Sequence, residues 1–205
     1  MVESRKYFRS MKKHLFWIIP LALIALVIGN AGGAYNKFVD ADVQVDEAWS
    51  QVETQYQRRF DLIPNLVETV KGYADFEQGT LVAVTEARAA ALGAMQQVPE
   101  SGDLGAFEQS NMVFGSALRG LLGYAETYPD LKANANFRDL QVQLEGTENR
   151  IATARTRYNE AVAGYNVAVR RFPGRLWAGL FGFEPREAFE SAAGAEQAPK
   201  IDFGS

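Results

Sequence analysis

Apolar residues recur every three or four positions through most of the chain after residue 36, which is the spacing of one face of an α-helix. The first stripe predicts a long helix that ends near residue 74, with Pro64 in its middle. Proline lacks a backbone N–H and crowds the preceding turn, so we expect a bend there. The bend frees the carbonyl of Phe60, which Asn65 or a neighbouring helix can satisfy. The apolar positions are Val45, Trp49, Val52, Tyr56, Ile63, Leu66, Val67, Val70, Tyr73 and Ala74.

Two shorter stripes follow, and each predicts a helix of about 35 Å. The turn-rich segment VPESGD, residues 98–103, separates them, and the pair Tyr128-Pro129 ends the second. The first of these stripes consists of Leu81, Val84, Ala87, Arg88, Leu92 and Met95. The second consists of Leu104, Phe107, Asn111, Phe114, Leu118, Leu121, Leu122 and Ala125.

The last stripe is the most regular in the sequence. Its members alternate by three and four over about five heptads, which is typical of a coiled-coil seam. Pro173 stops it, and the helix would be about 50 Å long. Four helices with short connections predict an all-α fold, an antiparallel up-and-down four-helix bundle with long first and fourth helices. The seam consists of Phe137, Leu140, Leu144, Thr147, Ile151, Ala154, Tyr158, Ala161, Tyr165, Ala168 and Phe172.

Residues 15–35, LFWIIPLALIALVIGNAGGAY, carry no charge and are long enough to cross a bilayer. Residues 1–14 hold five basic and one acidic side chain, a net charge of +4, which favours the cytoplasm. We therefore expect a transmembrane helix with the body of the protein on the outer side. The alternative is a cleaved signal peptide, because residues 31–34 are small.

The first and fourth predicted helices are longer than the other two, so their surplus forms a two-helix stalk near the membrane. A lone pair of helices cannot bury its apolar face on all sides. We therefore expect the protein to self-associate.

The composition removes several classes of chemistry. The chain has no cysteine, and its one histidine, His14, lies beside the apolar run, so the body lacks a thiol or imidazole for catalysis or metal binding. After residue 14, 16 basic and 24 acidic residues give a net charge of −8 without a basic stripe, which argues against nucleic-acid binding. No phosphate-loop or calcium-loop motif is present in the sequence. We expect no cofactor and no metal.

Charged residues indicate how the first and last helices face each other. If Asp75 lies near Lys132, the numbers of facing residues in two antiparallel helices sum to about 207. This register predicts three facing pairs: Arg59–Glu148, Glu53–Arg155 and Trp49–Tyr158. We interpret the charged candidates as a polar network that fixes the helix register, and a partner-binding polar groove is the alternative. The candidates are Arg58, Arg59, Asp61, Glu148 and Arg155.

The repeat YNEAVAGYN places Tyr158-Asn159 and Tyr165-Asn166 seven residues apart, with the tyrosines on the seam and the asparagines beside it. Such asparagines can fix the register of a partner by bonding across a helix interface. Ordinary packing with solvated amides is the alternative. The same two interpretations apply to Asn65 and Asn149.

Residues 173–190 carry several aromatic side chains, among them Trp177, Phe181 and Phe183. The fourth helix returns toward the bilayer, so this segment should arrive there. Its aromatic residues either touch the interface or cap the end of the stalk or a neighbouring subunit. We favour packing, because two glycines and Pro185 interrupt an amphipathic helix.

The chain thus divides into a basic segment (1–14), a transmembrane anchor (15–35), a helical bundle (36–172), a membrane-proximal aromatic segment (173–190) and a flexible tail (191–205).

Two stretches resemble the LemA family: RRFDLIPNLVETVKGYADFE at residues 58–77 and YPDLKANANFRDLQVQLEGTENRIATARTRYNEAVAGYNVAVRRFP at residues 128–173, followed by the pair Gly182-Phe183. The resemblance implies a bacterial membrane-anchored helical bundle with no established enzyme activity. We expect the anchor in the inner (cytoplasmic) membrane, the N-terminus in the cytoplasm and the body on the periplasmic side. Some magnetosome membrane proteins look similar, which implies a role in organising membranes. The sequence departs from the family at Phe76, where many members have histidine.

These features predict a non-enzymatic envelope scaffold or adaptor. Its expected partners are the lipid bilayer, further copies of the chain and a membrane protein. One alternative is an accessory factor in membrane proteolysis or the envelope stress response that uses Asp61, Lys71 or Glu148. The other is a membrane-shaping protein that acts by crowding or through its tail.

Overall fold

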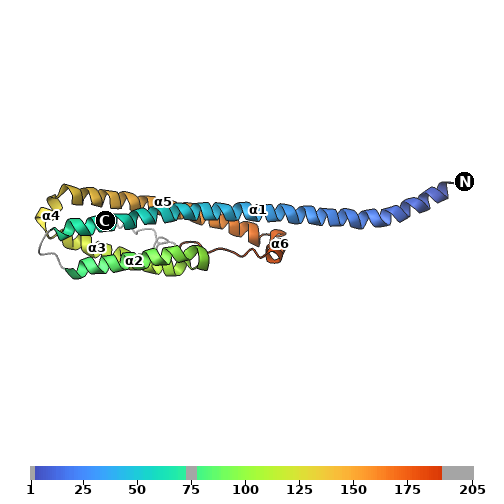
Figure 1. The fold of residues 1–205 in the computed structure, drawn as a ribbon. Coiled ribbons are helices and arrows are strands. Elements are labelled where there is room, and N and C mark those ends of the chain that lie inside the picture. Colours follow the sequence, from blue (N-terminus) through green and yellow to red (C-terminus); the bar gives the residue numbers. More distant parts are fainter. Residues whose placement is uncertain (1–2, 73–77, 191–205) are drawn as a thin grey trace, which may run out of the picture. The chain divides into compact units, whose positions relative to one another are not determined.

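The computed structural model describes residues 3–72 and 78–190, with side chains from residue 18 onwards. All regular secondary structure within these residues is helical, which confirms the all-α fold class (Figure 1). Phe76, the tail 191–205 and the expected approach of Asp75 to Lys132 fall outside the described residues. The helices are α1 (Glu3–Lys71), α2 (Gln78–Ser101), α3 (Leu104–Ala125), α4 (Pro129–Ala133), α5 (Ala135–Arg170) and α6 (Gly174–Phe181).

The helices belong to two compact units, and α1 and α5 each contribute to both. Unit 1 combines the chain up to residue 44 with residues 164–185. Unit 2 combines residues 45–163 with the segment that begins at residue 186. Unit 2 therefore contains the candidate interaction residues between Arg58 and Asn65 in α1 and between Glu148 and Asn159 in α5.

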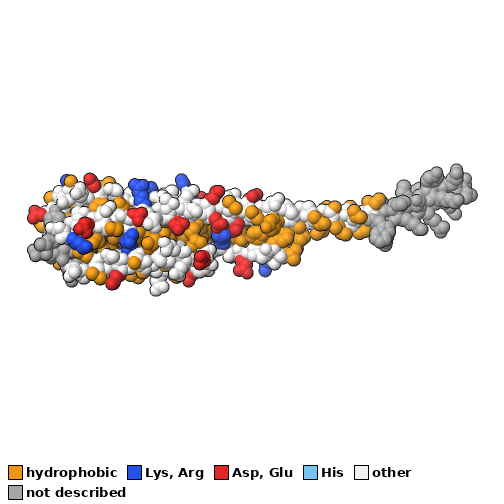
Figure 2. Space-filling model, in the orientation of Figure 1, with side chains coloured by type: hydrophobic (Ala, Val, Ile, Leu, Met, Phe, Trp, Pro, Cys, Tyr) orange, Lys and Arg blue, Asp and Glu red, His pale blue; other side chains and the backbone are white. Residues whose placement is uncertain are grey.

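In unit 1, the apolar stretch forms part of α1, and its residues 18–30 are all exposed. Leu21 and Leu26 are both 69% exposed, and Figure 2 shows hydrophobic side chains gathered along this part of the helix. By length and composition, this is a helix that can cross a membrane. An apolar surface of this extent is unfavourable in water, so the long apolar helix supports a membrane protein.

In unit 2, α1 buries every described apolar position of the predicted stripe, from Val45 to Val70. Phe60 and Arg59 are also buried, although the sequence pattern did not place them in the stripe. The helix continues through Pro64 to its end. The carbonyl oxygen of Phe60 accepts a hydrogen bond of 2.7 Å from Nε of Arg88 in α2. This confirms that a neighbouring helix satisfies the carbonyl that the proline leaves free.

Helices α2 and α3 pack side by side as a hairpin (Figure 1). The turn is shorter than the predicted break over residues 98–103, because α2 includes Pro99. Val98 is buried, and its carbonyl accepts a hydrogen bond of 2.9 Å from the N–H of Gly102, which holds the last turn in place. Gly102 has φ of 67°, a left-handed conformation that glycine adopts without steric cost. Asp103 then caps α3.

The short helix α4 was not expected, because five residues are too few to show a period. Pro129 occupies its first turn, where the missing N–H costs nothing. Asn134 ends α4, and its Oδ1 accepts a hydrogen bond of 3.1 Å from the N–H of Phe137 in the first turn of α5.

The predicted seam positions of α5 from Phe137 to Ala168 are all buried except Ala161, which is half-buried. Val162 and Val169 are 1% and 4% exposed, whereas Phe172 is 77% exposed and lies beyond the helix. Toward the end of α5 the buried face therefore includes the residue after the seam position as well, because an α-helix has 3.6 residues per turn and drifts away from a strict seven-residue repeat.

Candidate functional site

The candidate site lies where the segment 186–190 meets three helices of unit 2. Phe189 is only 4% exposed. Its ring stacks on Trp49 of α1 with a centroid distance of 6.2 Å, and it packs edge-on against Phe107 of α3 at 6.4 Å. Tyr158 of α5 lies edge-on at 5.3 Å. The guanidinium carbon of Arg155 is 4.4 Å from the ring centroid, a cation–π geometry. We call this arrangement the Phe189 site.

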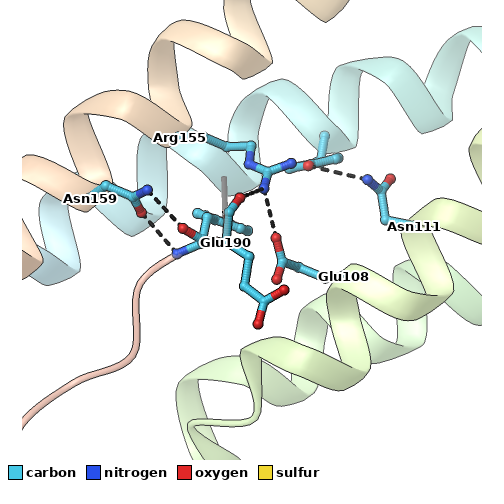
Figure 3. Close-up of polar contacts among 7 residues, drawn as sticks. Glu108, Asn111, Arg155, Asn159 and Glu190 are labelled. Carbon is cyan, nitrogen blue, oxygen red and sulfur yellow. Dashed lines mark hydrogen bonds and ion pairs between the residues drawn. The ribbon is translucent and has the colours of Figure 1, made fainter. Parts of the chain in front are cut away.

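Side chains of α5 also form hydrogen bonds with the main chain of the segment (Figure 3). The side-chain amide of Asn159 forms two hydrogen bonds with the main chain of Phe189. Its Nδ2 donates to the Phe189 carbonyl oxygen at 3.0 Å, and its Oδ1 accepts from the Phe189 N–H at 2.9 Å. The hydroxyl of Tyr158 donates to the carbonyl of Glu187 at 3.2 Å, and Nη2 of Arg155 to that of Glu190 at 3.3 Å. Recognition through main-chain atoms plus one anchoring side chain is typical of a bound extended peptide.

The repeat YNEAVAGYN therefore binds the main chain of the segment that follows α6, which neither sequence interpretation included. In unit 2, Tyr158 and Asn159 bond to the main chain of the segment that follows α6. In unit 1, the hydroxyl of Tyr165 donates to the carbonyl of Glu184 at 2.8 Å. The amide of Asn159 is thus neither solvated nor bonded to a second helix.

Arg155 also forms an ion pair, with Nη2 2.6 Å from Oε1 of Glu108 in α3 (Figure 3). The arginine and glutamate side chains are 30% and 21% exposed. Arg155 therefore forms its ion pair with Glu108 and not with Glu53, the residue expected to face it. The Phe189 ring and the Glu190 carbonyl hold the guanidinium on the α3 side.

The other two expected pairs across α1 and α5 are confirmed. Nη1 of Arg59 lies 3.2 Å from Oε2 of Glu148, and the rings of Trp49 and Tyr158 are 5.7 Å apart. Arg59 is 7% exposed and lies over Phe114 of α3 at 4.9 Å. The Glu148 side chain is 60% exposed, so this ion pair lies at the edge of the α1–α5 contact, in the expected register.

Tyr56 is buried beside these arginines, and its hydroxyl accepts a hydrogen bond of 3.3 Å from Nδ2 of Asn111 in α3. Burial raises the pKa of Tyr56 above its ordinary value of 10.0, against the opposing effect of the nearby positive charges of Arg155 and Arg59. Burial likewise raises the pKa of Tyr158. Both hydroxyls therefore stay neutral in the folded protein at pH values where an exposed tyrosine ionises.

These tyrosines predict that the protein loses stability in alkali. The pKa of Tyr56 is higher in the folded protein than in the unfolded chain, so the unfolded chain releases the proton first as the pH rises past 10.0. The free energy of unfolding therefore falls between the unfolded pKa and the folded pKa. Below the unfolded pKa, this contribution to stability is fully present. Urea unfolding followed by tryptophan fluorescence between pH 8 and pH 11 would measure it. Tyr56→Phe should make the decline shallower, and an unchanged decline in this variant would contradict the assignment to Tyr56.

The remaining polar candidates of unit 2 lie on the surface. Arg58, Asp61 and Asn65 line one shallow groove along α1, and Pro64 and Asn149 are exposed. Oδ1 of Asp61 accepts a hydrogen bond of 2.8 Å from Gln57 of the same helix. The structure therefore does not join Arg58 and Asp61 to the Arg59–Glu148 pair.

The aromatic candidates of unit 1 contact α1. Nε1 of Trp177 donates to Oδ1 of Asn30 at 2.9 Å. Phe181 packs edge-on against Tyr35 at a centroid distance of 5.3 Å, and Phe183 lies 5.3 Å from Phe38. Asn166 also has an interaction within the chain.

Sequence reasoning missed some of the residues that complete these contacts. Asn111 and Arg88 did carry a signal, because each is a polar residue within an apolar stripe. Glu108 carried none, since its neighbours give no reason to prefer it over other exposed acids. Among residues 18–72 and 78–190, no three acidic or histidine side chains are grouped so that they could hold a metal ion.

Comparison with known proteins gives two kinds of relative. The chain is 26% identical to magnetosome protein MamQ 2 of Paramagnetospirillum magneticum, over 86% of this chain and 72% of that protein. It is 28% identical to magnetosome protein MamQ of Magnetospirillum gryphiswaldense, over 78% and 66% of the two chains. It is 23% identical to protein LemA of Metamycoplasma hominis, over 77% and 68%. The sequence model of the LemA family matches residues 48–203, which is well over half of the chain. This protein therefore belongs to the LemA family.

Proposed function

We propose that this protein is a non-enzymatic scaffold or adaptor of the bacterial envelope, anchored by the apolar part of α1. The observation that carries the proposal is how the body uses its polar side chains. Arg59, Arg155 and Asn159 each hold one part of the protein against another. Polar side chains that form contacts within the protein stabilise a rigid body, and such a body can present its surface to other molecules.

The proposed architecture is an antiparallel up-and-down four-helix bundle formed by α2, α3 and the distal parts of α1 and α5. The contacts of unit 2 support it: residue numbers rise along α1 as they fall along α5 in the Arg59–Glu148 and Trp49–Tyr158 pairs. Helix α1 passes from the apolar stretch into unit 2 without a break. The positive charge of residues 1–14 favours a cytoplasmic N-terminus and a periplasmic body.

The proposed partners are the bilayer, further copies of the chain and a membrane protein. Two relatives are named as magnetosome proteins, and this favours membrane shaping as the second candidate function. A role as an accessory factor in proteolysis finds less support. Its candidate side chains contact different residues, since Asp61 bonds to Gln57, Lys71 approaches Glu68 at 3.8 Å and Glu148 pairs with Arg59.

Self-association can be tested with two full-length copies that carry different tags and are co-expressed in bacterial membranes. After solubilisation in mild detergent, purification through one tag should recover the other, and brief crosslinking in intact membranes should give a ladder that starts at a dimer. The matched control mixes membranes that express each copy separately, which should give no mixed complex. An exclusively monomeric protein without any co-purified membrane protein would overturn the scaffold proposal.

A further inference from the structure

A groove of about 570 Å³ lies in unit 1 between α1 and the junction of α5 and α6. Gly29 and Gly33 lie along its α1 side, and a Cβ added at either glycine would meet no atom within 4 Å. Glycine therefore leaves open space there, and a larger side chain would enter the groove. Phe172 lines the opposite side and is 77% exposed.

Two cations stand at this groove, Lys37 from α1 and Arg171 after the end of α5. Both are exposed, and neither forms an ion pair with any residue in the described part of the chain. Arg170 and Arg175 add two more exposed positive charges near the same junction. Cations left unpaired beside an apolar groove favour an anionic ligand that also has an apolar part.

The groove lies at the edge of the apolar stretch. Gly29 and Gly33 fall within residues 15–35, and Lys37 follows two residues later. The hydrogen bond from Trp177 to Asn30 fixes α6 at the same level of α1. Leu176 and Leu180 of α6 are 64% and 71% exposed, so the apolar surface continues beyond the groove. At the boundary of a membrane, such a surface meets lipid rather than water.

We infer that this groove binds an anionic phospholipid of the surrounding bilayer. The lipid phosphate lies between Lys37 and Arg171, and one acyl chain runs along Gly29 and Gly33 past Phe172. A juxtamembrane basic residue attracts anionic lipid by about fivefold, so two such residues should give a preference of about thirtyfold over zwitterionic lipid. This inference rests on the proposed anchoring of α1 in the bilayer, but it is separate from self-association, and either of these two can fail without the other.

The test uses the full-length protein in mild detergent with equal amounts of phosphatidylglycerol and phosphatidylcholine, and native mass spectrometry counts the retained lipids. The unaltered chain should retain phosphatidylglycerol about thirtyfold more than phosphatidylcholine. The double variant Lys37→Gln/Arg171→Gln should lose this preference. The matched control Arg58→Gln/Arg157→Gln removes the same charge from exposed positions in unit 2 and should keep it.

A second variant tests the shape of the site with its charges intact. Gly33→Leu fills the groove, and because its Cβ meets no neighbouring atom, the helices should remain in place. Circular dichroism should confirm equal helix content in all variants. Phosphatidylglycerol retention should fall at least fivefold. Three results would each overturn the inference. The unaltered chain could retain the two lipids equally, the double variant could match its control, or Gly33→Leu could retain phosphatidylglycerol in full. Full lipid retention together with loss of self-association in Gly33→Leu would assign the groove to chain–chain contact instead.

Discussion

Phe189→Ala is expected to lower the free energy of unfolding of this protein by about 3 kcal/mol. The ring is 4% exposed and contacts aromatic side chains from α1, α3 and α5, so its removal leaves a cavity that three helices would have to close. The value lies at the low end for a buried phenylalanine. The reason is that residues 186–190 are not part of a helix, so we expect the loss to be limited to the docking free energy of this segment.

Urea unfolding of the full-length protein in detergent, followed by tryptophan fluorescence, measures this effect, because the Trp49 ring stacks on Phe189. The matched control is Met112→Ala in α3, where the side chain is 68% exposed and a change within about 0.5 kcal/mol is expected. Limited proteolysis should also cut the Phe189→Ala chain faster within residues 186–190. Equal stability of the two variants would show that the ring does not hold the segment in solution.

Glu108→Gln is expected to lower the free energy of unfolding by about 2 kcal/mol. The substitution keeps the size of the side chain and removes the charge that lies 2.6 Å from Arg155. The Arg155 side chain is only 30% exposed, so water replaces the lost carboxylate poorly. The same guanidinium covers the Phe189 ring, so the Phe189 site should loosen as well.

A matched control and a double-mutant cycle isolate the ion pair. Glu68→Gln removes an equivalent charge from a pair with Lys71 whose side chains are 80% and 57% exposed, and should cost less than about 0.5 kcal/mol. In an Arg155→Met background, Glu108→Gln should also become nearly neutral, because its partner is absent. A Glu108→Gln effect as small as that of Glu68→Gln would mean that the pair adds no stability. An undiminished effect in the Arg155→Met background would mean that Glu108 acts through another residue.

The sequence by itself determined the helical fold and most buried positions of α1, α2, α3 and α5. Periodicity carries this information, because each residue that faces the core must be apolar at a spacing set by the helix. The register of α1 on α5 followed in part from charge: Arg59 and Trp49 lie opposite the residues expected. Pro64 predicted an unsatisfied carbonyl for the same local reason, since the missing N–H is a property of that residue alone.

Only the tertiary structure decided which polar side chains contact one another. Asn159 stood out in the sequence, but its partner Phe189 lies 30 residues away in a segment without a periodic pattern. Arg155 had several acids within reach, and its contacts with Phe189 and Glu190 select Glu108 of α3 rather than Glu53 of α1. A periodic pattern reports which face of a helix is buried. The pairing of long polar side chains depends on distances between segments remote in sequence, and these exist only once the chain has folded.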